Sequence, residues 1–271
     1  MRPRQMALLA ALAGFTVVNL MPIAWAFLTS IKQPIDAFAV PPRLVFPPTL
    51  EFHYAVWFEK GFGWFFLNSL VIAGATVCLS VPIGTLAGYA LARVKTGGTR
   101  AVLFGLLAVR MFPYMLLAIP FFVMAKNLGL HDTYVMIVAA LVAVNQPFTI
   151  WLMRGFFLDV PVELEEAARI DGCGNWQAFR LVILPVVRPG LAVTSLFSLL
   201  LAYNEFLFAL VLTGTRTKPL PVAISEYGAE DISYWSISAA AAIAIMLPIV
   251  LFMIFAQRHL VRGLTFGTVK G

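Results

Sequence analysis

The sequence predicts an all-α membrane protein with six transmembrane helices. Of its 271 residues, 61% are hydrophobic and 12% are charged, and that charged share is about half the usual one for a soluble domain. Such a chain lacks the polar surface that a water-soluble enzyme of this length needs, and it is too hydrophobic to be intrinsically disordered. The charge-poor stretches long enough to cross a bilayer are 5–31, 63–92, 101–125, 133–153, 190–215 and 232–257.

Lysine and arginine in the connections predict the orientation of a single transmembrane domain, 1–271. Twelve of these residues fall on one side and six on the other. Cytoplasmic loops are enriched in Lys and Arg, so the side with twelve is the cytoplasm and both termini lie there. Arg2 and Arg4 before an apolar run also loosely fit a signal peptide, but the run is longer than the ~7–15 residues of a signal core. The first stretch is therefore expected to remain as a helix.

Common catalytic motifs do not occur in the chain. It has no G-x-x-x-x-G-K-[ST] phosphate loop, no H-E-x-x-H zinc helix and no G-x-S-x-G nucleophile elbow. Cys78 and Cys173 lie far apart, so neither a disulfide framework nor a Cys-rich metal site is expected. The net charge of +6 does not predict nucleic-acid binding, because in a membrane protein the placement of Lys and Arg matters more than their sum. No catalytic residue, metal or cofactor is therefore expected in this chain.

Two long outer connections differ in composition. The first, 32–60, contains five prolines and is predicted to be an ordered, non-helical excursion over the membrane surface. The second, 213–231, is rich in Gly, Pro and Thr. Its acidic end could be no more than a solvated face.

The longest cytoplasmic connection, 154–188, contains five of the thirteen acidic residues. Pro161 and the glutamates after it favour the start of a helix, and Gly172 and Gly174 favour its end. A second short helix, capped by Asn175, is expected after the turn. The small residues of the first helix could enter a groove on a partner, or the loop could rest on the lipid headgroups. The spacing alone favours neither alternative.

This connection resembles the EAA signature of ABC importer permeases. The matching residues are Glu166-Ala167-Ala168, then Gly172, Val182 (usually Ile in the family) and Leu184-Pro185. Further stretches are similar to the carbohydrate branch of that family: Asn68-Ser69, AGYALAR at 87–93, LGLHDT at 128–133, YNEFLFAL at 203–210 and RGLTFGTVKG at 262–271. The last of these is similar to the tail of the maltose-type second permease subunit. The resemblance covers 68–271.

The resemblance implies a type I ABC importer permease fold in the cytoplasmic (inner) membrane and the import of a sugar, polyol or glycoside. It implies as partners a second permease subunit, two ATPase subunits that bind ATP and Mg, and an extracytoplasmic solute-binding protein. The residues expected to dock the ATPase are Glu166, Ala167, Ala168, Asp171, Gly172, Leu184 and Pro185. The tail is expected to contact it through Leu264, Thr265, Gly267 and Lys270. The outer connection 213–231 is expected to reach into the binding protein, or to be a plain connector.

Polar residues within the predicted spans are candidates for the substrate pathway. Glu205 is the most informative, because an ionisable group near mid-span is costly and usually faces a cavity or a partner. Tyr203, Asn204 and Glu205 offer hydroxyl, amide and carboxylate groups that suit a sugar, although a structural hydrogen bond is favoured for Glu205. On a continuous helix Asn204 and Glu205 would point about 100° apart, and Asn204 is predicted to lie nearer the sugar. The other candidates are Arg110, Asn145 and Gln146.

The rival hypothesis is a proton-coupled secondary transporter in which Glu205 and Arg110 form a relay. The same two residues could also form a purely structural pair. Against the relay, the two halves of the sequence show no paired broken-helix pattern, and the EAA-like loop would have no role. A structural or receptor membrane protein is a weaker third alternative. ATP-dependent uptake into vesicles without a proton gradient would separate the first two hypotheses.

Overall fold

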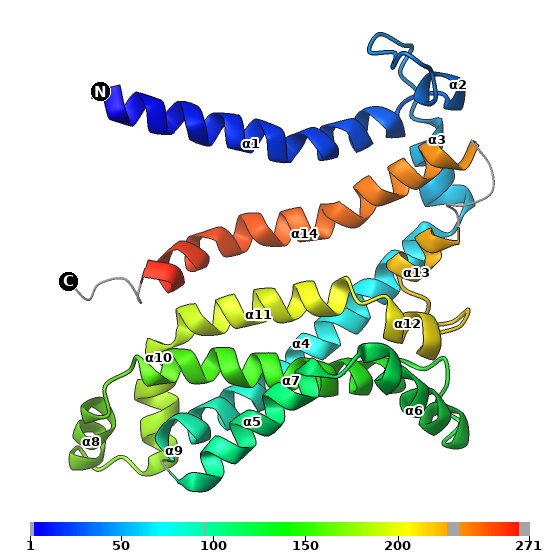
Figure 1. Cartoon of the computed structure of the whole chain (residues 1–271). Helices are drawn as coiled ribbons and strands as arrows, with labels where there is room; N and C mark the ends of the chain where they lie inside the picture. The colour runs from blue at the N-terminus through cyan, green and yellow to red at the C-terminus, as the bar shows by residue number, and fades with distance from the viewer. Residues whose placement is uncertain (1–2, 95, 227–232, 266–271) are drawn as a thin grey trace. The chain divides into compact units, whose positions relative to one another are not determined.

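The computed structural model of the chain describes residues 3–94, 96–226 and 233–265, with the side chains of the last helix described over 234–254. Every regular element in these ranges is a helix (Figure 1), which confirms the predicted all-α class for the described residues. The chain divides into two compact units. Unit 1 combines Met1–Phe66 with Leu220–Pro248, and unit 2 combines Leu67–Pro219 with Ile249–Gly271.

Unit 1 is built around the connection 32–60. Its helices are α1 (Pro3–Ser30), α2 (Pro34–Ala37), α3 (Glu51–Tyr54), the π-helix η1 (Ala55–Glu59), α13 (Leu220–Ser225), and the first parts of α4 (Phe62–Arg93) and α14 (Ser233–Thr265). The buried core side chains are Phe52, Val56, Phe62, Leu220, Ala240, Ala241 and Ala244. α1 contributes only Ser30 to the buried residues of the chain, so its apolar side chains remain exposed.

The proline-rich connection 32–60 contains helix, contrary to the expectation of a non-helical excursion. It holds α2, α3 and η1. Pro34 occupies the first turn of α2, where the missing N–H has no intrahelical partner to lose. The other four prolines lie in the irregular stretch 38–50. The prolines are therefore confined to the first turn of α2 and to the irregular stretch, and they do not exclude helix from the connection.

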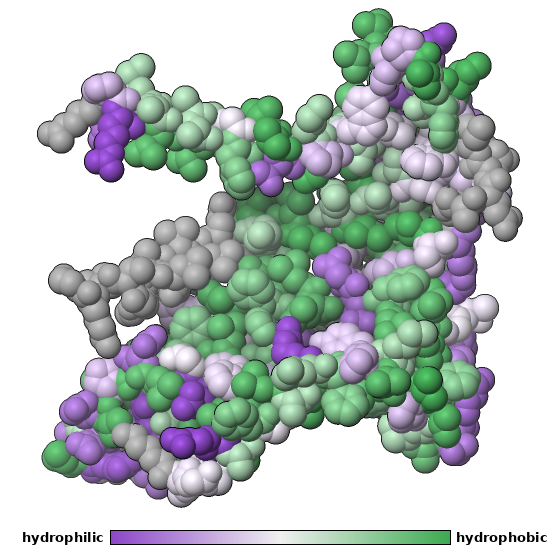
Figure 2. Space-filling view, in the orientation of Figure 1, coloured by the Kyte–Doolittle hydropathy of each residue, from purple (hydrophilic) through white to green (hydrophobic). Residues whose placement is uncertain are grey.

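Unit 2 contains the rest of α4 and a run of shorter helices. In chain order these are α5 (Gly97–Met111), α6 (Tyr114–Asn127), α7 (Tyr134–Leu158), α8 (Glu163–Ile170), α9 (Asn175–Ala178), the π-helix η2 (Phe179–Ile183), α10 (Leu184–Val186), α11 (Arg188–Tyr203) and α12 (Leu207–Leu212). α7 packs along α11, and α6 packs against α12 (Figure 1). The loop elements α8 and α9 lie at one end of the unit, where hydrophilic residues gather beside the hydrophobic surface of the longer helices (Figure 2).

A hydrophobic cluster joins the loop elements to the long helices of unit 2. Its buried members are Ala92, Met153, Phe157, Val160, Phe179, Ile183 and Val187. They come from the last turns of α4 and α7, from the connection after α7, from η2 and from the residue before α11. The loop is therefore packed against the helix ends by apolar burial.

Two of the predicted spans are broken. The stretch 101–125 corresponds to α5 and α6, which meet at an angle of 90°. Phe112 has extended backbone with φ of −66° and ψ of 135°, because the following Pro113 disfavours a helical predecessor and has no N–H to donate. In the stretch 190–215, α11 ends at Tyr203 and α12 begins at Leu207. The expectation of one continuous helix through Asn204 and Glu205 is therefore wrong.

By length and hydropathy, α1, α4, α7 and Tyr234–Ile254 of α14 could each cross a membrane alone. Two bent pairs could each add one span: α5 with α6, and Asn175–Val186 with α11, which meet at 75°. The described residues thus offer between four and six spans, and the predicted number of six is the upper limit of that range.

Candidate functional site

The connection 154–188 folds into two helices separated by a tight turn. Glu163, Glu165 and Glu166 lie in the first turn of α8, where their negative charge complements the helix N-terminus. α8 ends at Ile170, and Gly172 follows with φ of +89°. This left-handed backbone favours glycine, which confirms the predicted contribution of Gly172 to the turn.

The two loop helices begin differently from the expectation. Gly174, and not Asn175, is the N-cap residue of α9, and its N–H donates to Gln177 Oε1 at 2.8 Å. Gln177, three residues after the N-cap, thus satisfies the N–H of Gly174, and Asn175 is the first residue of the helix instead of its cap. α8 has Val162 as its N-cap residue, so Pro161 lies just before the helix and not within its first turn.

The seven residues expected to dock an ATPase fall into two groups. Those exposed on α8 and the turn after it are Glu166, Ala167, Asp171 and Gly172. Ala168 is buried and Leu184 and Pro185 are half-buried, with Leu184 packed against the hydrophobic cluster. The first group can contact a partner directly, whereas the second group shapes the loop from inside.

Three large apolar side chains on this loop were missed by the sequence analysis. Ile170 is 86% exposed, Trp176 is 61% exposed and Leu181 is 63% exposed. Several large apolar residues exposed on one short loop indicate a contact surface for another protein or for lipid headgroups. Their apolar character in an otherwise charged segment was the available signal.

Glu165 connects α8 to the long helices. Its Oε1 accepts from Arg93 Nε at 2.5 Å, and its Oε2 accepts from the Tyr89 hydroxyl at 3.0 Å. Arg169, four residues along α8, forms a longer ion pair with Glu165 Oε2 at 3.7 Å and is half exposed. Arg93 also donates to the carbonyls of Phe157 at 2.9 Å and Val160 at 3.1 Å. One arginine therefore joins α8, the end of α4 and the end of α7.

The partners of Glu165 come from a stretch whose family resemblance carried no assigned role. Tyr89 and Arg93 belong to 87–93, at the end of α4. The Tyr89 ring also lies 4.7 Å from that of Phe179 and 5.3 Å from that of Phe157, between ring centroids. The stretch 87–93, at the end of a predicted span, thus holds the connection 154–188 in place through Tyr89 and Arg93.

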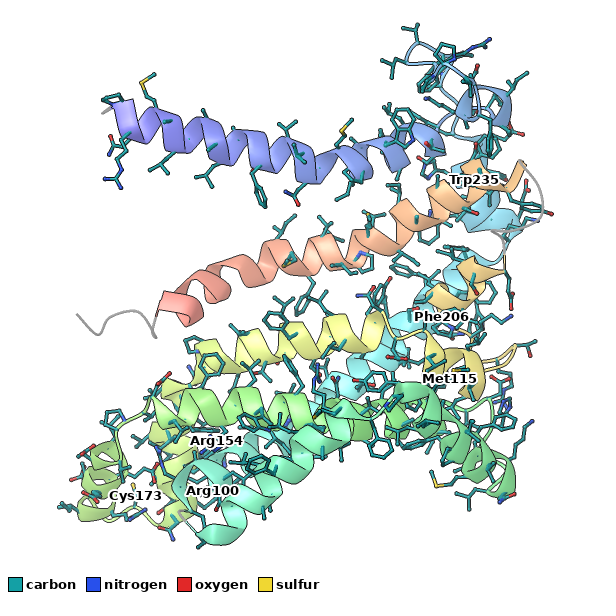
Figure 3. All side chains as sticks on the ribbon, in the orientation of Figure 1. Arg100, Met115, Arg154, Cys173, Phe206 and Trp235 are labelled. Atoms are coloured by element: carbon teal, nitrogen blue, oxygen red, sulfur yellow. The ribbon has the colours of Figure 1, made fainter. Side chains whose placement is uncertain are left out.

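At the other end of unit 2, the break between α11 and α12 holds the predicted pathway residues (Figure 3, near Phe206). Tyr203 is buried, whereas Asn204 is exposed and its amide donates to Leu200 O at 2.9 Å. Glu205 is half-buried, and its Oε1 accepts from the N–H groups of Leu207 at 3.1 Å and Phe208 at 3.2 Å. Glu205 therefore caps α12.

The cavity beside Glu205 is small. It measures about 30 Å³, which is room for about one water molecule. Its lining residues are Tyr114, Leu141, Val144, Asn145, Leu201, Ala202 and Glu205. This pocket of unit 2 does not accommodate a sugar ring in the conformation described.

Asn145 and Gln146, expected to face a cavity, mainly connect helices. The buried Asn145 amide donates to Ser198 O at 3.3 Å and to Ser198 Oγ at 3.1 Å, which ties α7 to α11. Gln146 Nε2 donates to Ser80 O at 3.3 Å, which ties α7 to α4. Asn145 also lines the small cavity.

Arg110 lies beside Phe148, whereas one hypothesis paired it with Glu205. Its guanidinium carbon lies 5.1 Å from the centroid of the Phe148 ring. Among the residues that the structure describes, the ion pairs do not include one between Arg110 and Glu205. The structural pair proposed as one alternative for these residues is therefore not formed.

Asp132 organises the start of the connection that begins at Thr213. Its backbone is left-handed, with φ of 59°, and its carboxylate accepts from the N–H groups of Gly214 at 2.8 Å, Thr217 at 3.0 Å and Arg216 at 3.1 Å. The Thr217 hydroxyl donates to Oδ1 at 2.7 Å. Burial raises the pKa of Asp132, but these hydrogen bonds outweigh it and lower the pKa to about 2.

Asn68 supports the same connection from α4. Its amide donates to the carbonyls of Arg216 at 3.2 Å and Lys218 at 2.9 Å, and its Oδ1 accepts from the Tyr134 hydroxyl at 2.5 Å. The stretches 68–69 and 128–133, similar to the family but without a predicted role, thus meet at residues 213–218. Of the acidic end, Glu230 and Asp231 lie outside the described residues.

The tail expected to contact an ATPase is described only in part. Leu264 and Thr265 lie in the last turn of α14, and their side chains are not described, while Gly267 and Lys270 lie outside the described residues.

Comparisons with known proteins identify a family and several relatives of this chain. Residues 80–266 match a family described as binding-protein-dependent transport system inner membrane component. The trehalose transport system permease protein SugB of Mycobacterium tuberculosis is 35% identical over 93% of this chain and 93% of its own length. The diacetylchitobiose uptake system permease protein DasC of Streptomyces coelicolor is 33% identical over 92% of this chain and 91% of its own.

A solved structure shares the fold. One chain of a bacterial ABC transporter involved in the import of alginate aligns with a TM-score of 0.78, at 23% identity, over 96% of this chain and 97% of that one. Together with the family match over 80–266, this establishes the architecture. The chain belongs to the family of inner-membrane components of binding-protein-dependent transport systems, and it is an ABC transporter permease with the all-helical type I importer fold.

Proposed function

We propose that this permease is one of two different membrane subunits of an importer that moves a carbohydrate into the cytoplasm. Two relatives at 33% and 35% identity, aligned over more than nine-tenths of the chain, are named for trehalose and diacetylchitobiose. This observation carries the substrate class. A solute-binding protein would deliver the sugar, and two partner ATPase subunits would bind ATP and Mg and perform the hydrolysis.

The proposed topology has six spans with both termini in the cytoplasm. It takes α1, α4, α7 and α14 as one span each, and the bent pair of α5 and α6 as a fifth. The sixth is the stretch 190–215 with α11 and α12, which leaves Asn175–Val186 outside the membrane. The twelve-to-six division of Lys and Arg supports the orientation. Under this topology the connection 154–188 is cytoplasmic, and the connection that starts at Thr213 faces the binding protein.

The proposed coupling site is the exposed side of α8 and its turn. Glu166, Ala167, Asp171 and Gly172 would contact an ATPase subunit, with Ile170 in the same surface. Closure of the ATPase pair would move α8, and the Glu165–Arg93 contact supports transmission of that movement to α4 and α7. The tail, with Leu264, Thr265, Gly267 and Lys270, is proposed to lie against the same subunits.

The proposed sugar site is shared with the second permease. The pocket beside Glu205, at about 30 Å³, is too small for a sugar ring, and this supports a site that a second chain completes. Asn204 is exposed and is proposed to be the nearer contact, with Tyr203, Asn145, Gln146 and Arg110 behind it. Glu205 is proposed to hold the break in the span in shape.

The function can be tested with the reconstituted importer. Proteoliposomes that contain this chain, its partner permease, the ATPase and the binding protein are loaded with ATP, and uptake of labelled disaccharide is measured with a protonophore present. Uptake that requires internal ATP and survives the protonophore is the expected result. Uptake that needs a proton gradient and no ATP would establish the secondary-transporter hypothesis instead.

A further inference from the structure

A cavity of about 570 Å³ opens in unit 2 where α4 stops, α5 starts and α7 ends. Arg100 and Arg154 line it, together with the apolar residues Leu91, Leu103 and Leu158. Figure 3 shows both arginines at the end of the unit that also carries Cys173 in the turn between α8 and α9. The cavity is separate from the exposed side of α8 and from the break at Glu205.

The two arginines that line this cavity have no carboxylate partner among the ion pairs of the described residues. Arg154 Nε donates to Leu91 O at 3.2 Å, which fixes its guanidinium at the cavity wall. Nearby Arg93 differs, because Glu165 and two carbonyls occupy its donors. Arg100 is exposed and can turn its donors toward a ligand.

We propose that this cavity binds the phosphate group of an anionic phospholipid from the cytoplasmic leaflet. Basic pockets between transmembrane helices on the cytoplasmic side suit anionic lipid headgroups, and guanidinium groups bind phosphate through paired hydrogen bonds. Leu91, Leu103 and Leu158 would contact the glycerol and acyl chains, whereas a soluble phosphate ion would leave these apolar side chains without a partner. The inference rests on the proposed membrane orientation and goes beyond the proposed transport activity.

The occupant would touch three helix ends at once. Leu91 belongs to α4, Arg100 and Leu103 to α5, and Arg154 and Leu158 to α7. α4 and α7 are the helices that Arg93 connects to α8. A lipid bound here would therefore contact the same helix ends that receive the movement of the loop.

Native mass spectrometry of the assembled importer measures the proposed binding. The complex is purified with its partner subunits and exposed to equal amounts of phosphatidylglycerol and phosphatidylcholine in detergent. The wild type should retain phosphatidylglycerol preferentially. Arg100→Gln should weaken that binding about fivefold, and Arg100→Gln with Arg154→Gln about thirtyfold, from a similar contribution by each basic residue near a membrane surface. Arg188→Gln is the matched control, because Arg188 is exposed at the start of α11 and does not line the cavity.

Equal retention of phosphatidylglycerol by the wild type and the Arg100→Gln variant would overturn the proposal. Arg100→Gln decides the matter if Arg154→Gln impairs assembly through the lost bond to Leu91. Displacement of the lipid by millimolar inorganic phosphate would also overturn it, in favour of a soluble anion. ATP-dependent uptake by the same preparations separates the two proposals: normal uptake without lipid preference contradicts only the lipid site, and lipid preference without uptake contradicts only the transport function.

Discussion

Arg93 Nε donates to Glu165 Oε1 at 2.5 Å, and this contact joins the exposed loop helix α8 to the end of the long helix α4. The Glu165 side chain is 3% exposed and that of Arg93 is 15% exposed, so their attraction is screened far less than between surface charges. The remaining donors of Arg93 bind carbonyls at the end of α7 and just after it. Displacement of α8 therefore acts on α4 and α7 together.

Glu165→Ala should lower both stability and coupling. Arg93 would lose its charged partner in a poorly hydrated place, at a cost of about 1–3 kcal/mol, while its bonds to Phe157 O and Val160 O limit the loss. The number of sugar molecules taken up per ATP hydrolysed should fall in proteoliposomes. Glu165→Gln keeps an acceptor and should be milder.

Arg169→Ala is the control for that pair. Arg169 is half exposed and lies 3.7 Å from Glu165, and exposed pairs contribute about 0–1 kcal/mol. It should leave transport per ATP nearly unchanged. Unchanged coupling in Glu165→Ala as well would show that the movement of α8 reaches the spans by another route.

Gly172→Val should disrupt the turn after α8. A β-branched side chain at φ of +89° is disfavoured by about 1–2 kcal/mol or more, so α8 would be misplaced. Co-purification of the ATPase and sugar uptake should fall together, with membrane insertion unaffected. Gly174→Ala is the matched control, because Gly174 has φ of −68°, which any residue adopts. Wild-type co-purification for Gly172→Val would contradict the docking role of this turn.

Acidification should loosen the second outer connection only at low pH. Hydrogen bonds outweigh burial and lower the pKa of Asp132 from 3.8 to about 2. Because the folded pKa lies below the unfolded one, the carboxylate stabilises the fold above about pH 4, and this contribution is lost as the pH falls toward 2. Hydrogen exchange at residues 213–218 should therefore accelerate over that window.

Asp132→Asn should accelerate the same exchange at neutral pH, because the amide cannot accept all four hydrogen bonds. Asparagine tolerates the left-handed backbone of position 132, so the loss is confined to the side chain. Asp159→Asn changes an exposed carboxylate and serves as the control. Equal exchange in the wild type and Asp132→Asn would mean that Asn68 alone holds the connection.

Glu205→Ala should weaken assembly of the importer. The change removes the acceptor for the N–H groups of Leu207 and Phe208, and loss of an N-terminal cap costs about 0.5–2 kcal/mol. Glu205→Gln retains an acceptor oxygen and should assemble more nearly as the wild type does. The measurement is the yield of complete complex in size-exclusion chromatography.

Asn204→Ala should lower sugar uptake without weakening assembly, in contrast to Glu205→Ala. Asn204 is exposed, and its only described side-chain bond is to Leu200 O, one turn back. Uptake should fall while the yield of complex stays near normal. If Glu205→Ala assembles normally without transporting and Asn204→Ala is silent, the two roles are reversed.

Local features of this protein were readable from the sequence. Hydropathy located α1, α4 and α7 because a spanning helix satisfies its backbone within one segment and needs only an apolar surface. Gly172 predicted a turn because glycine adopts positive φ at little cost, and this preference depends on the residue itself and not on distant contacts. Hydropathy failed at Phe112 and Asn204, where the chain leaves the helix within an apolar stretch. At Phe112 the following proline was the local signal of the break.

The tertiary structure alone decided which polar groups meet. Arg93 and Glu165 are 72 residues apart, and Asn68 is 148 residues from Arg216. Hydropathy and spacing carry no information about contacts at such separations. The sequence therefore did not predict that Arg93 binds Glu165 or that Asn68 binds the connection that begins at Thr213. From its sequence position the carboxylate of Glu205 could have served a sugar or a proton relay, although a structural hydrogen bond was favoured. Only the break after Tyr203 brings the N–H groups of Leu207 and Phe208 to it and makes it a cap.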